Sequence, residues 1–255
     1  MLGSQSKTRE YKLDALEFTK ALYDLMKPRV MSLAIFTCVV GFLIAPIKNL
    51  EYLNAFFSIL AVALGSGAAG ALNCWYEADL DSLMSRTCLR PIPTGKLTRK
   101  QALIFGTISS FVSVVALYFF SNLVAASLLA LTISFYVFVY TIWLKRKTPQ
   151  NIVIGGAAGA LPPVIGWSIA TGDVSLEPII LFLIIFIWTP SHFWALSLFK
   201  SDDYKKANIP MLPVTSGIKT TKNNILIYSI LLFPIALAPF FLGYMGFIYL
   251  SFSFS

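Results

Sequence analysis

Charged residues are scarce in this chain, and their scarcity excludes most soluble folds. Only 13% of its 255 residues are Asp, Glu, Lys or Arg, whereas soluble domains average about 25%. Hydrophobic residues make up 57%, and apolar runs long enough to cross a bilayer as helices recur throughout. We therefore predict an all-α polytopic transmembrane bundle with seven full spans, at 29–48, 53–76, 101–120, 122–143, 151–171, 177–199 and 224–243, and a partial eighth from Tyr244.

Cysteine and histidine are also almost absent. Cys38, Cys74 and Cys88 are isolated, lack zinc-site spacing and indicate no disulfide framework. His192 is the only histidine and lies inside a predicted span. An ionisable group at that depth is a functional candidate; the alternative is a histidine that hydrogen-bonds a neighbouring helix.

The basic residues follow the predicted topology. The net charge is +8, and with a cytoplasmic N-terminus 19 of the 20 Lys and Arg residues fall on the cytoplasmic side, leaving only Lys48 outside. Such asymmetry is the positive-inside signal of a membrane protein. It explains the basic charge without a nucleic-acid partner, so we expect no nucleic acid to bind.

Residues 1–28 form a separate N-terminal segment ahead of the transmembrane domain, which we place at 29–255. The segment has no apolar core beside a cleavage site, so it is not a secretory signal, and its four acidic residues argue against a mitochondrial transit peptide. Leucines interleaved with charges predict an amphipathic surface helix. We expect the bacterial inner (plasma) membrane, with the mitochondrial inner membrane as the alternative.

Small residues cluster in two predicted spans, as GSGAAGA and as GGAAGALPP. In membranes such patches usually let helices pack closely; the alternative is that they leave room for an apolar ligand. Pro162 and Pro163 should kink their helix and help to build a cavity. The two long inner loops, 77–100 and 200–223, lie four helices apart, which suggests two parallel halves.

The first of these loops carries a polar pattern. Asn73, Glu77 and Asp81 are spaced i, i+4 and i+8, which predicts one stripe at a helix end, and Arg86 and Arg90 follow at i and i+4. Oxygen ligands of this kind suit Mg²⁺ with substrate phosphates, and arginine forks match phosphate oxygens. An ordinary hydrated loop is the alternative. Asp79 points away from the stripe.

A second polar group is predicted on the same side of the membrane. Asp202, Asp203 and Lys206 end the sixth span, and if that helix continued, His192 and Asp203 would share a face. The end of the fourth span and the start of the fifth add basic and amide groups, whose alternative role is a positive-inside anchor. These are Lys145, Arg146, Gln150 and Asn151.

Polar groups at one mouth above an apolar interior suit a substrate with a diphosphate head and a hydrocarbon tail. The metal and basic residues would stabilise departing diphosphate, and aromatic faces could stabilise the allylic cation. The aromatic candidates, each of which could equally be a packing residue, are Trp75, Tyr76, Trp188 and Trp194.

NCWYEADLD resembles the first Asp-rich motif, NxxxDxxxD, of the intramembrane aromatic prenyltransferases of the UbiA superfamily, with Glu77 where Asp is usual. DSLMSRTCLRPIPTG, YTIWLKRKTPQNIVIGGAAGALPPVIGW and WTPSHFWALSLFKSDDYKKANIPMLPV resemble its heme-farnesylating branch. The matching segments extend from Asn73 to Val214.

This resemblance implies nine spans, of which the ninth lies beyond the end of this chain, and transfer of farnesyl from farnesyl diphosphate to a vinyl group of heme B, giving heme O. It implies Mg²⁺ as cofactor, the lipid bilayer as surroundings, and heme A synthase or terminal-oxidase assembly factors as partners. Asn73, Glu77, Asp81 and Asp203 would be metal ligands. Arg86, Arg90 and His192 would join them in the catalytic set. The substrate-binding set would be Asp79, Lys145, Arg146, Gln150, Asn151, Asp202, Asp203 and Lys206.

Two alternatives stay open at this point. A sister enzyme could prenylate a quinone precursor such as 4-hydroxybenzoate, although TPQNIVIGGAAGA and the Arg86–Arg90 pair argue against it. A transporter or a non-catalytic heme-binding subunit is the other. Transporters more often keep charges near mid-membrane, and heme-binding subunits usually offer more than one histidine.

Overall fold

The computed structural model describes residues 14–46 and 51–253, and within these ranges every regular element is a helix. The fold class predicted from the sequence, an all-α transmembrane bundle, is confirmed. The helices are α1 (Ala15–Leu25), α2 (Pro28–Ile44), α3 (Tyr52–Tyr76), α4 (Ala78–Leu83), α5 (Arg99–Phe120), α6 (Leu123–Ser134), η1 (Phe135–Leu144), α7 (Asn151–Ala160), α8 (Pro162–Thr171), α9 (Leu176–Phe199), α10 (Ser201–Lys206), α11 (Leu212–Phe241) and α12 (Phe247–Ser253).

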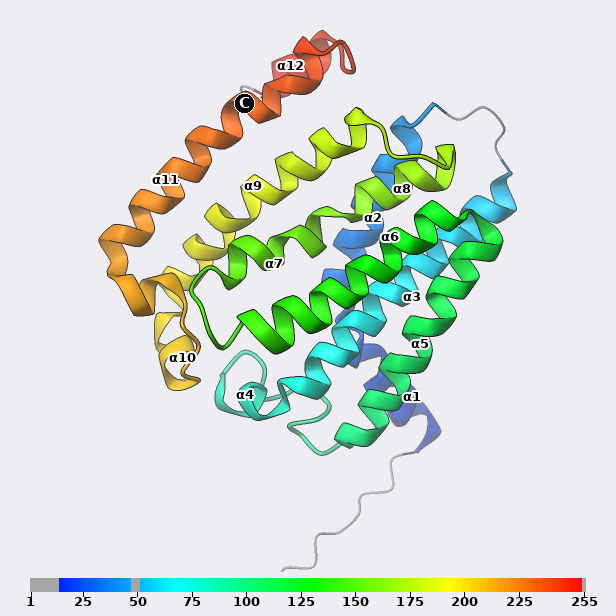
Figure 1. Cartoon of the computed structure of the whole chain (residues 1–255). Coiled ribbons are helices and arrows are strands. Elements are labelled where there is room, and N and C mark those ends of the chain that lie inside the picture. The colour runs from blue at the N-terminus through cyan, green and yellow to red at the C-terminus, as the bar shows by residue number, and fades with distance from the viewer. Residues whose placement is uncertain (1–13, 47–50, 254–255) are drawn as a thin grey trace, which may run out of the picture.

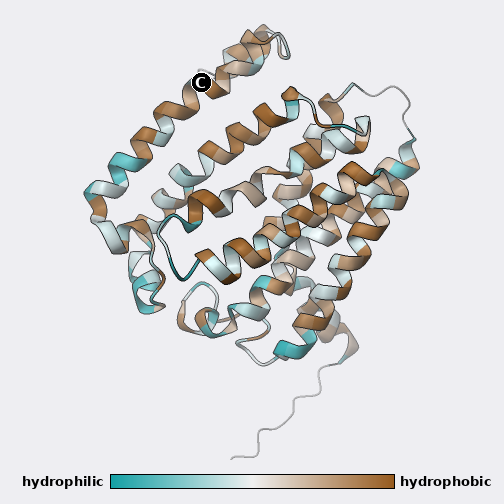
Figure 2. Ribbon diagram, in the orientation of Figure 1, coloured by the Kyte–Doolittle hydropathy of each residue, from teal (hydrophilic) through white to brown (hydrophobic). Residues whose placement is uncertain are grey.

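Six helical stretches in the described ranges are long and apolar enough to cross a membrane: α3, α5, α6 with η1, α7 with α8, α9 and α11. The bent pair α1–α2, with 56° between the two helices, gives a seventh if it forms one span. Figure 2 shows the apolar character along these helices. Pro162 begins α8 and separates it from α7, as expected from its missing N–H.

The predicted bounds are wrong near the C-terminus. The segment 200–223 is not a loop, because it contains α10 and the first turns of α11, which begins at Leu212 rather than at residue 224. Non-helical backbone at Gly217 (φ 79°) marks a kink inside α11. Glycine adopts this positive φ without the steric strain that a Cβ would bring. The predicted partial eighth span corresponds to α12, which begins at Phe247 rather than at Tyr244 and has seven residues within the described ranges.

Glycines let α2 and α8 approach through their backbones. A Cβ on Gly41 would lie 2.1 Å from the carbonyl oxygen of Pro163, and one on Gly166 would lie 1.9 Å from that of Cys38. Beside this contact, α3, α5, α6 and α8 share a buried apolar core that includes Val62, Leu117, Leu129 and Ile165. The two small-residue patches also pack closely, because a Cβ on Gly67 would lie 2.2 Å from the side chain of Met26 and one on Gly155 would lie 2.1 Å from the ring of Tyr140, as one of the two interpretations of those patches predicted.

The span that starts as α6 ends as a π-helix. Over the ten residues of η1 the backbone bonds reach five residues back, and the last, from the N–H of Lys145 to the carbonyl oxygen of Tyr140, is 3.0 Å long. Thr141 also donates from Oγ1 to the carbonyl oxygen of Tyr136. π-Helical turns are rare and often occur at functional sites.

The short polar elements gather at one end of the bundle, where Figure 1 places α1, α4 and α10. The predicted amphipathic helix is present as α1, capped by Asp14, although residues 1–13 of that segment lie outside the described ranges. Ala21 and Leu25 of α1 are buried against Ala71 and Cys74 of α3. The N-terminal segment thus packs against the end of the bundle that carries the predicted polar residues.

We expect Gly166→Ala to lower the free energy of unfolding by about 1–3 kcal/mol, because its methyl group would overlap the backbone of α2. Thermal unfolding of the detergent-purified protein measures this. Gly159→Ala is the matched control, since nothing lies within 4 Å of a Cβ there. Equal melting temperatures for the two variants would contradict the α2–α8 contact.

Candidate active site

Three buried polar residues follow one another at the end of α3. Asn73, Glu77 and Asp81 are only 1%, 2% and 3% exposed. The predicted uninterrupted helical stripe is wrong in detail, because Glu77 has non-helical backbone and separates α3 from α4. The N–H of Glu77 still bonds to the carbonyl of Asn73, and that of Asp81 to the carbonyl of Glu77. The break therefore leaves the i, i+4 register intact.

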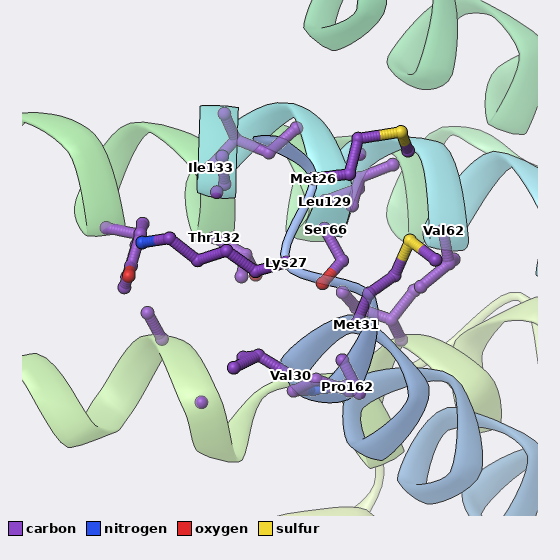
Figure 3. Close-up of a pocket in the computed structure, with 18 residues that line it drawn as sticks. Met26, Lys27, Val30, Met31, Val62, Ser66, Leu129, Thr132, Ile133 and Pro162 are labelled. Carbon is purple, nitrogen blue, oxygen red and sulfur yellow. The ribbon is translucent and has the colours of Figure 1, made fainter. Parts of the chain in front are cut away.

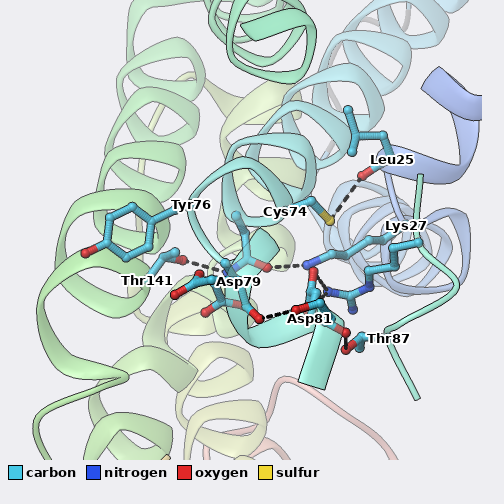
Figure 4. Close-up of polar contacts among 12 residues, drawn as sticks. Leu25, Lys27, Cys74, Tyr76, Asp79, Asp81, Thr87 and Thr141 are labelled. Carbon is cyan, nitrogen blue, oxygen red and sulfur yellow. Dashed lines mark hydrogen bonds and ion pairs between the residues drawn. The ribbon is translucent and has the colours of Figure 1, made fainter. Parts of the chain in front are cut away.

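Each of these residues has a cationic partner from elsewhere in the chain. Figure 4 shows Lys27 and Asp81 in this network of polar contacts. Lys145 donates from Nζ to Oε2 of Glu77 at 2.5 Å. Nη1 of Arg90 donates to both carboxylate oxygens of Asp81, at 2.8 Å each. Lys27 donates from Nζ to Oδ1 of Asn73. We call these six residues the polar cluster.

Asn73 is held on its other side by η1. Its Nδ2 donates to Oγ1 of Thr141 at 3.0 Å, so both atoms of the amide are engaged. The π-helical turn brings Thr141 and Lys145 to Asn73 and Glu77, and both pairs are separated by 68 residues. The end of the fourth span thus contacts two of the three buried polar residues.

A third ion pair lies nearer the surface. Asp79 accepts from Nη1 and Nη2 of Arg146 at 2.9 and 2.8 Å, and these hydrogen bonds hold the pKa of Asp79 below its usual value. Arg146 also lies over the ring of Tyr76, 5.2 Å from its centroid. Asp79 is thus exposed and paired with Arg146, whereas Glu77 and Asp81 are buried and have other cationic partners.

α10 and its flanking residues meet the segment after α4. Oγ of Ser85 donates to Oδ2 of Asp203 at 2.6 Å, and apolar side chains from both segments pack into one buried cluster with Ile152, among them Met84, Tyr204 and Ile209. Asn151 is fully buried. Its Nδ2 donates to the carbonyl of Thr148, while its Oδ1 has no partner. The two predicted polar loops thus come together.

Several predicted residues stand apart from the polar cluster. In the part of the chain that the structure describes, the exposed side chains of Arg86, Asp202 and Lys206 make no hydrogen bond or ion pair, and Gln150 is also exposed. Arg86 and Arg90 were expected to act as an i, i+4 pair. They differ because no helix extends over residues 84–98, and only Arg90 turns inward.

His192 is exposed on α9 and stacks on Trp188, with ring centroids 4.4 Å apart. Its predicted alignment with Asp203 on one helix is wrong, because α9 ends at Phe199 and α10 starts after Lys200. The hydrogen bond to a neighbouring helix, which was the alternative to a functional role, is not found among the described residues.

An apolar cavity of about 120 Å³ adjoins the polar cluster, between α2, α3, α6, η1, α7 and α8 (Figure 3). Lys27 belongs to both, since its side chain lines the cavity and its Nζ reaches Asn73. Gly159 also lines it. The four predicted aromatic candidates do not, whereas Tyr136 does. The arrangement can hold an anionic head beside an apolar tail.

A model of the UbiA prenyltransferase family matches residues 34–255. This chain belongs to that family. A protoheme IX farnesyltransferase of Pelagibacter ubique is 63% identical over 251 residues, covering 98% of this chain and 82% of the relative. One of Parvibaculum lavamentivorans is 52% identical over 250 residues, covering 98% and 78%. The resemblance seen in the sequence is confirmed.

A solved structure supports the fold independently. A UbiA homologue from Archaeoglobus fulgidus, bound to DMAPP and Mg²⁺, superposes with a TM-score of 0.75 at 17% identity. The match covers 91% of this chain and 81% of the homologue. At this identity the likeness establishes the fold and no more.

The donor atoms of the polar cluster fit a hard divalent cation. Two carboxylates and an amide oxygen are ligands that Mg²⁺ prefers, and Oε1 of Glu77 is buried without a hydrogen-bond partner. Across residues 14–46 and 51–253, however, no three His, Cys, Asp or Glu side chains form a metal-binding group. Asp203, the fourth predicted ligand, is engaged by Ser85.

Sequence reasoning missed three residues of this UbiA-family site. Lys27 was counted only as a positive-inside charge, and Thr141 and Ser85 lie within two of the segments that resemble the family but were assigned no role. The one available signal was the position of Lys27 directly before Pro28, at the predicted start of a span.

We expect Lys145→Met to lower the free energy of unfolding by about 3–5 kcal/mol, because it leaves the buried Glu77 carboxylate unpaired. Arg146→Met removes an exposed pair and should cost less than about 1 kcal/mol. Denaturant unfolding in detergent compares the two. Adding Glu77→Gln to Lys145→Met should restore much of the loss; no recovery would contradict the charge explanation.

Proposed function

We propose that this chain transfers the farnesyl group of farnesyl diphosphate to a vinyl group of heme B, with addition of water, to give heme O and diphosphate. The observation that carries this proposal is the polar cluster directly beside an apolar cavity. The 52–63% identity to chains named protoheme IX farnesyltransferase supports the choice of heme as the acceptor.

The polar cluster would bind the diphosphate. Asn73, Glu77 and Asp81 would hold Mg²⁺, which when bound neutralises charge on the phosphate oxygens. Arg90 and Lys145 supply positive charge from the side, and the planar fork of arginine matches phosphate geometry. Because these groups lie in fixed hydrogen bonds before substrate arrives, they can stabilise the leaving group without large reorganisation.

The cavity would bind the hydrocarbon tail. Its walls are mostly apolar, including Val62, Leu129, Ile133 and Ile165, and exclude water from the first carbon of the chain. That carbon's bond to oxygen breaks and both electrons leave with diphosphate. The vinyl π electrons of heme then form the new C–C bond, and water adds to the resulting cation and releases a proton.

The remaining predicted residues fit the heme side. His192 and Trp188 present a stacked, exposed ring pair on α9, which suits contact with a flat macrocycle. Arg86, Asp202 and Lys206 have exposed side chains that could meet polar groups of the acceptor. Asp79, Arg146, Gln150, Asn151 and Asp203 would shape the mouth of the site around both substrates.

We place the chain in the bacterial inner membrane with its N-terminus and polar cluster on the cytoplasmic side. The proposal is supported by the distribution of basic residues, 19 of 20 of which lie on the side so assigned. Enzymes that oxidise or insert heme O, such as heme A synthase or oxidase assembly factors, would be its partners.

The direct test incubates membranes that contain this chain with heme B, farnesyl diphosphate and Mg²⁺. We expect a heavier heme, identified by chromatography and mass, that carries one hydroxyethylfarnesyl group and is lost with EDTA. Prenylation of 4-hydroxybenzoate instead of heme would overturn the acceptor, and product that persists in EDTA would overturn the metal requirement.

We expect Asp81→Asn to reduce turnover at least 100-fold, because it removes a proposed metal ligand and the anion that holds Arg90. Initial rates of heme O formation at equal amounts of inserted protein measure the effect. Asp173→Asn is the matched control, since Asp173 lies beyond α8 and away from the polar cluster. Wild-type turnover of Asp81→Asn would remove Asp81 from the site.

We expect Gly159→Leu to lower kcat/KM for farnesyl diphosphate about 10-fold or more while sparing a shorter prenyl diphosphate, because the new side chain enters the cavity. Competition between farnesyl and geranyl diphosphate reports the preference. Ile154→Leu, an exposed position on the same helix, is the control. An unchanged preference would mean that the tail lies elsewhere.

A further inference from the structure

Lys27 occupies a position that no other charged side chain within residues 14–46 and 51–253 shares. Among the residues that line the apolar cavity it alone carries a formal charge, and its Nζ donates to Oδ1 of Asn73 in the polar cluster. Figure 3 shows its side chain extending along the cavity, and Figure 4 shows its ammonium at the polar end. Lys27 therefore marks the boundary between the two halves of the site.

The charges of the polar cluster do not balance. Glu77 is paired with Lys145 and Asp81 with Arg90, which leaves Lys27 bonded to a neutral amide. None of the ion pairs found among the described residues includes Lys27. A buried ammonium without an anion is unfavourable, so the polar cluster is built to receive one more negative group.

The backbone at Lys27 is unusual as well. Its φ of 55° and ψ of 64° lie in the left-handed region, which in the described ranges only one other non-glycine residue, Asn208, enters with a positive φ. Such conformations are held against local strain by their surroundings and cluster at functional sites. The conformation ends α1 and starts α2 at the point where the side chain must enter the site.

Two glycines of α3 make room for this turn. A Cβ on Gly67 would lie 2.2 Å from the side chain of Met26, and one on Gly70 would lie 3.1 Å from the carbonyl oxygen of Met26. Small residues in the GSGAAGA patch thus admit the turn that carries Lys27. The left-handed backbone of Lys27, the space left by these glycines and the unbalanced charge of the polar cluster therefore all favour the same position for the Lys27 side chain.

From this placement we propose that Lys27 is a substrate-contacting residue that binds the diphosphate on the side facing the tail, beside the oxygen that leaves the first prenyl carbon. When the C–O bond breaks, the electron pair goes to that oxygen, and the ammonium of Lys27 stabilises its charge. In the free protein Asn73 holds the ammonium in place. This inference rests on the proposed function. It adds a residue that lies where the diphosphate head of the substrate meets its hydrocarbon tail.

Lys27→Gln tests the charge alone, because glutamine keeps a donor for Asn73. Inorganic diphosphate with Mg²⁺ is titrated calorimetrically into detergent-purified wild type, Lys27→Gln, Lys27→Arg and the control Lys20→Gln, whose side chain is exposed on α1. We expect at least 10-fold weaker binding for Lys27→Gln, partial recovery with arginine and no change for the control. Thermal unfolding without ligand confirms that each variant is folded.

Kinetics separate substrate contact from a merely structural role. Lys27→Gln should raise KM for farnesyl diphosphate and lower kcat while leaving KM for heme B unchanged. Equal diphosphate affinity and equal kinetics for wild type and Lys27→Gln would overturn the proposal. If wild type binds diphosphate but makes no prenylated heme, the proposed function fails, and the binding comparison still decides the role of Lys27.

Discussion

Two carboxylates buried at one end of a membrane bundle constrain everything around them. An unpaired buried charge is costly, so Glu77 and Asp81 can exist there only if cations reach them. Lys145 arrives from the end of η1 and Arg90 from the segment after α4. The positions of these segments follow from the need to compensate charge, because the surrounding helices offer mainly apolar faces.

The small residues of α3 and α7 serve two purposes that sequence interpretation had set against each other. Gly67 admits the turn at Met26, and Gly155 packs against the ring of Tyr140. Gly159, four residues further along α7, borders open space in the cavity. The same small-residue patches therefore pack closely against neighbouring helices on one side and border the apolar cavity on the other. The close packing fixes the helices around the cavity.

Local patterns revealed the spans and the polar loops, because hydrophobic runs and i, i+4 spacing are properties of neighbouring residues. They did not reveal the break at Glu77, the π-helical turn or the start of α11 at Leu212. Lys27 and Asn73 are 46 residues apart, and nothing in either neighbourhood encodes their contact. Arg86 resembled Arg90 in sequence, and only the fold of residues 84–98 distinguishes the inward from the outward side chain.

The π-helical end of the fourth span also limits how the chain can change in length. Loss of one residue within 135–144 would break the pattern of bonds that reach five residues back, turn the following residues about the helix axis and carry Lys145 away from Glu77, although the apolar character of the span would hardly alter. Insertions and deletions should therefore be rejected in η1, which sets the rotational phase between a membrane-embedded helix and the polar cluster at its end.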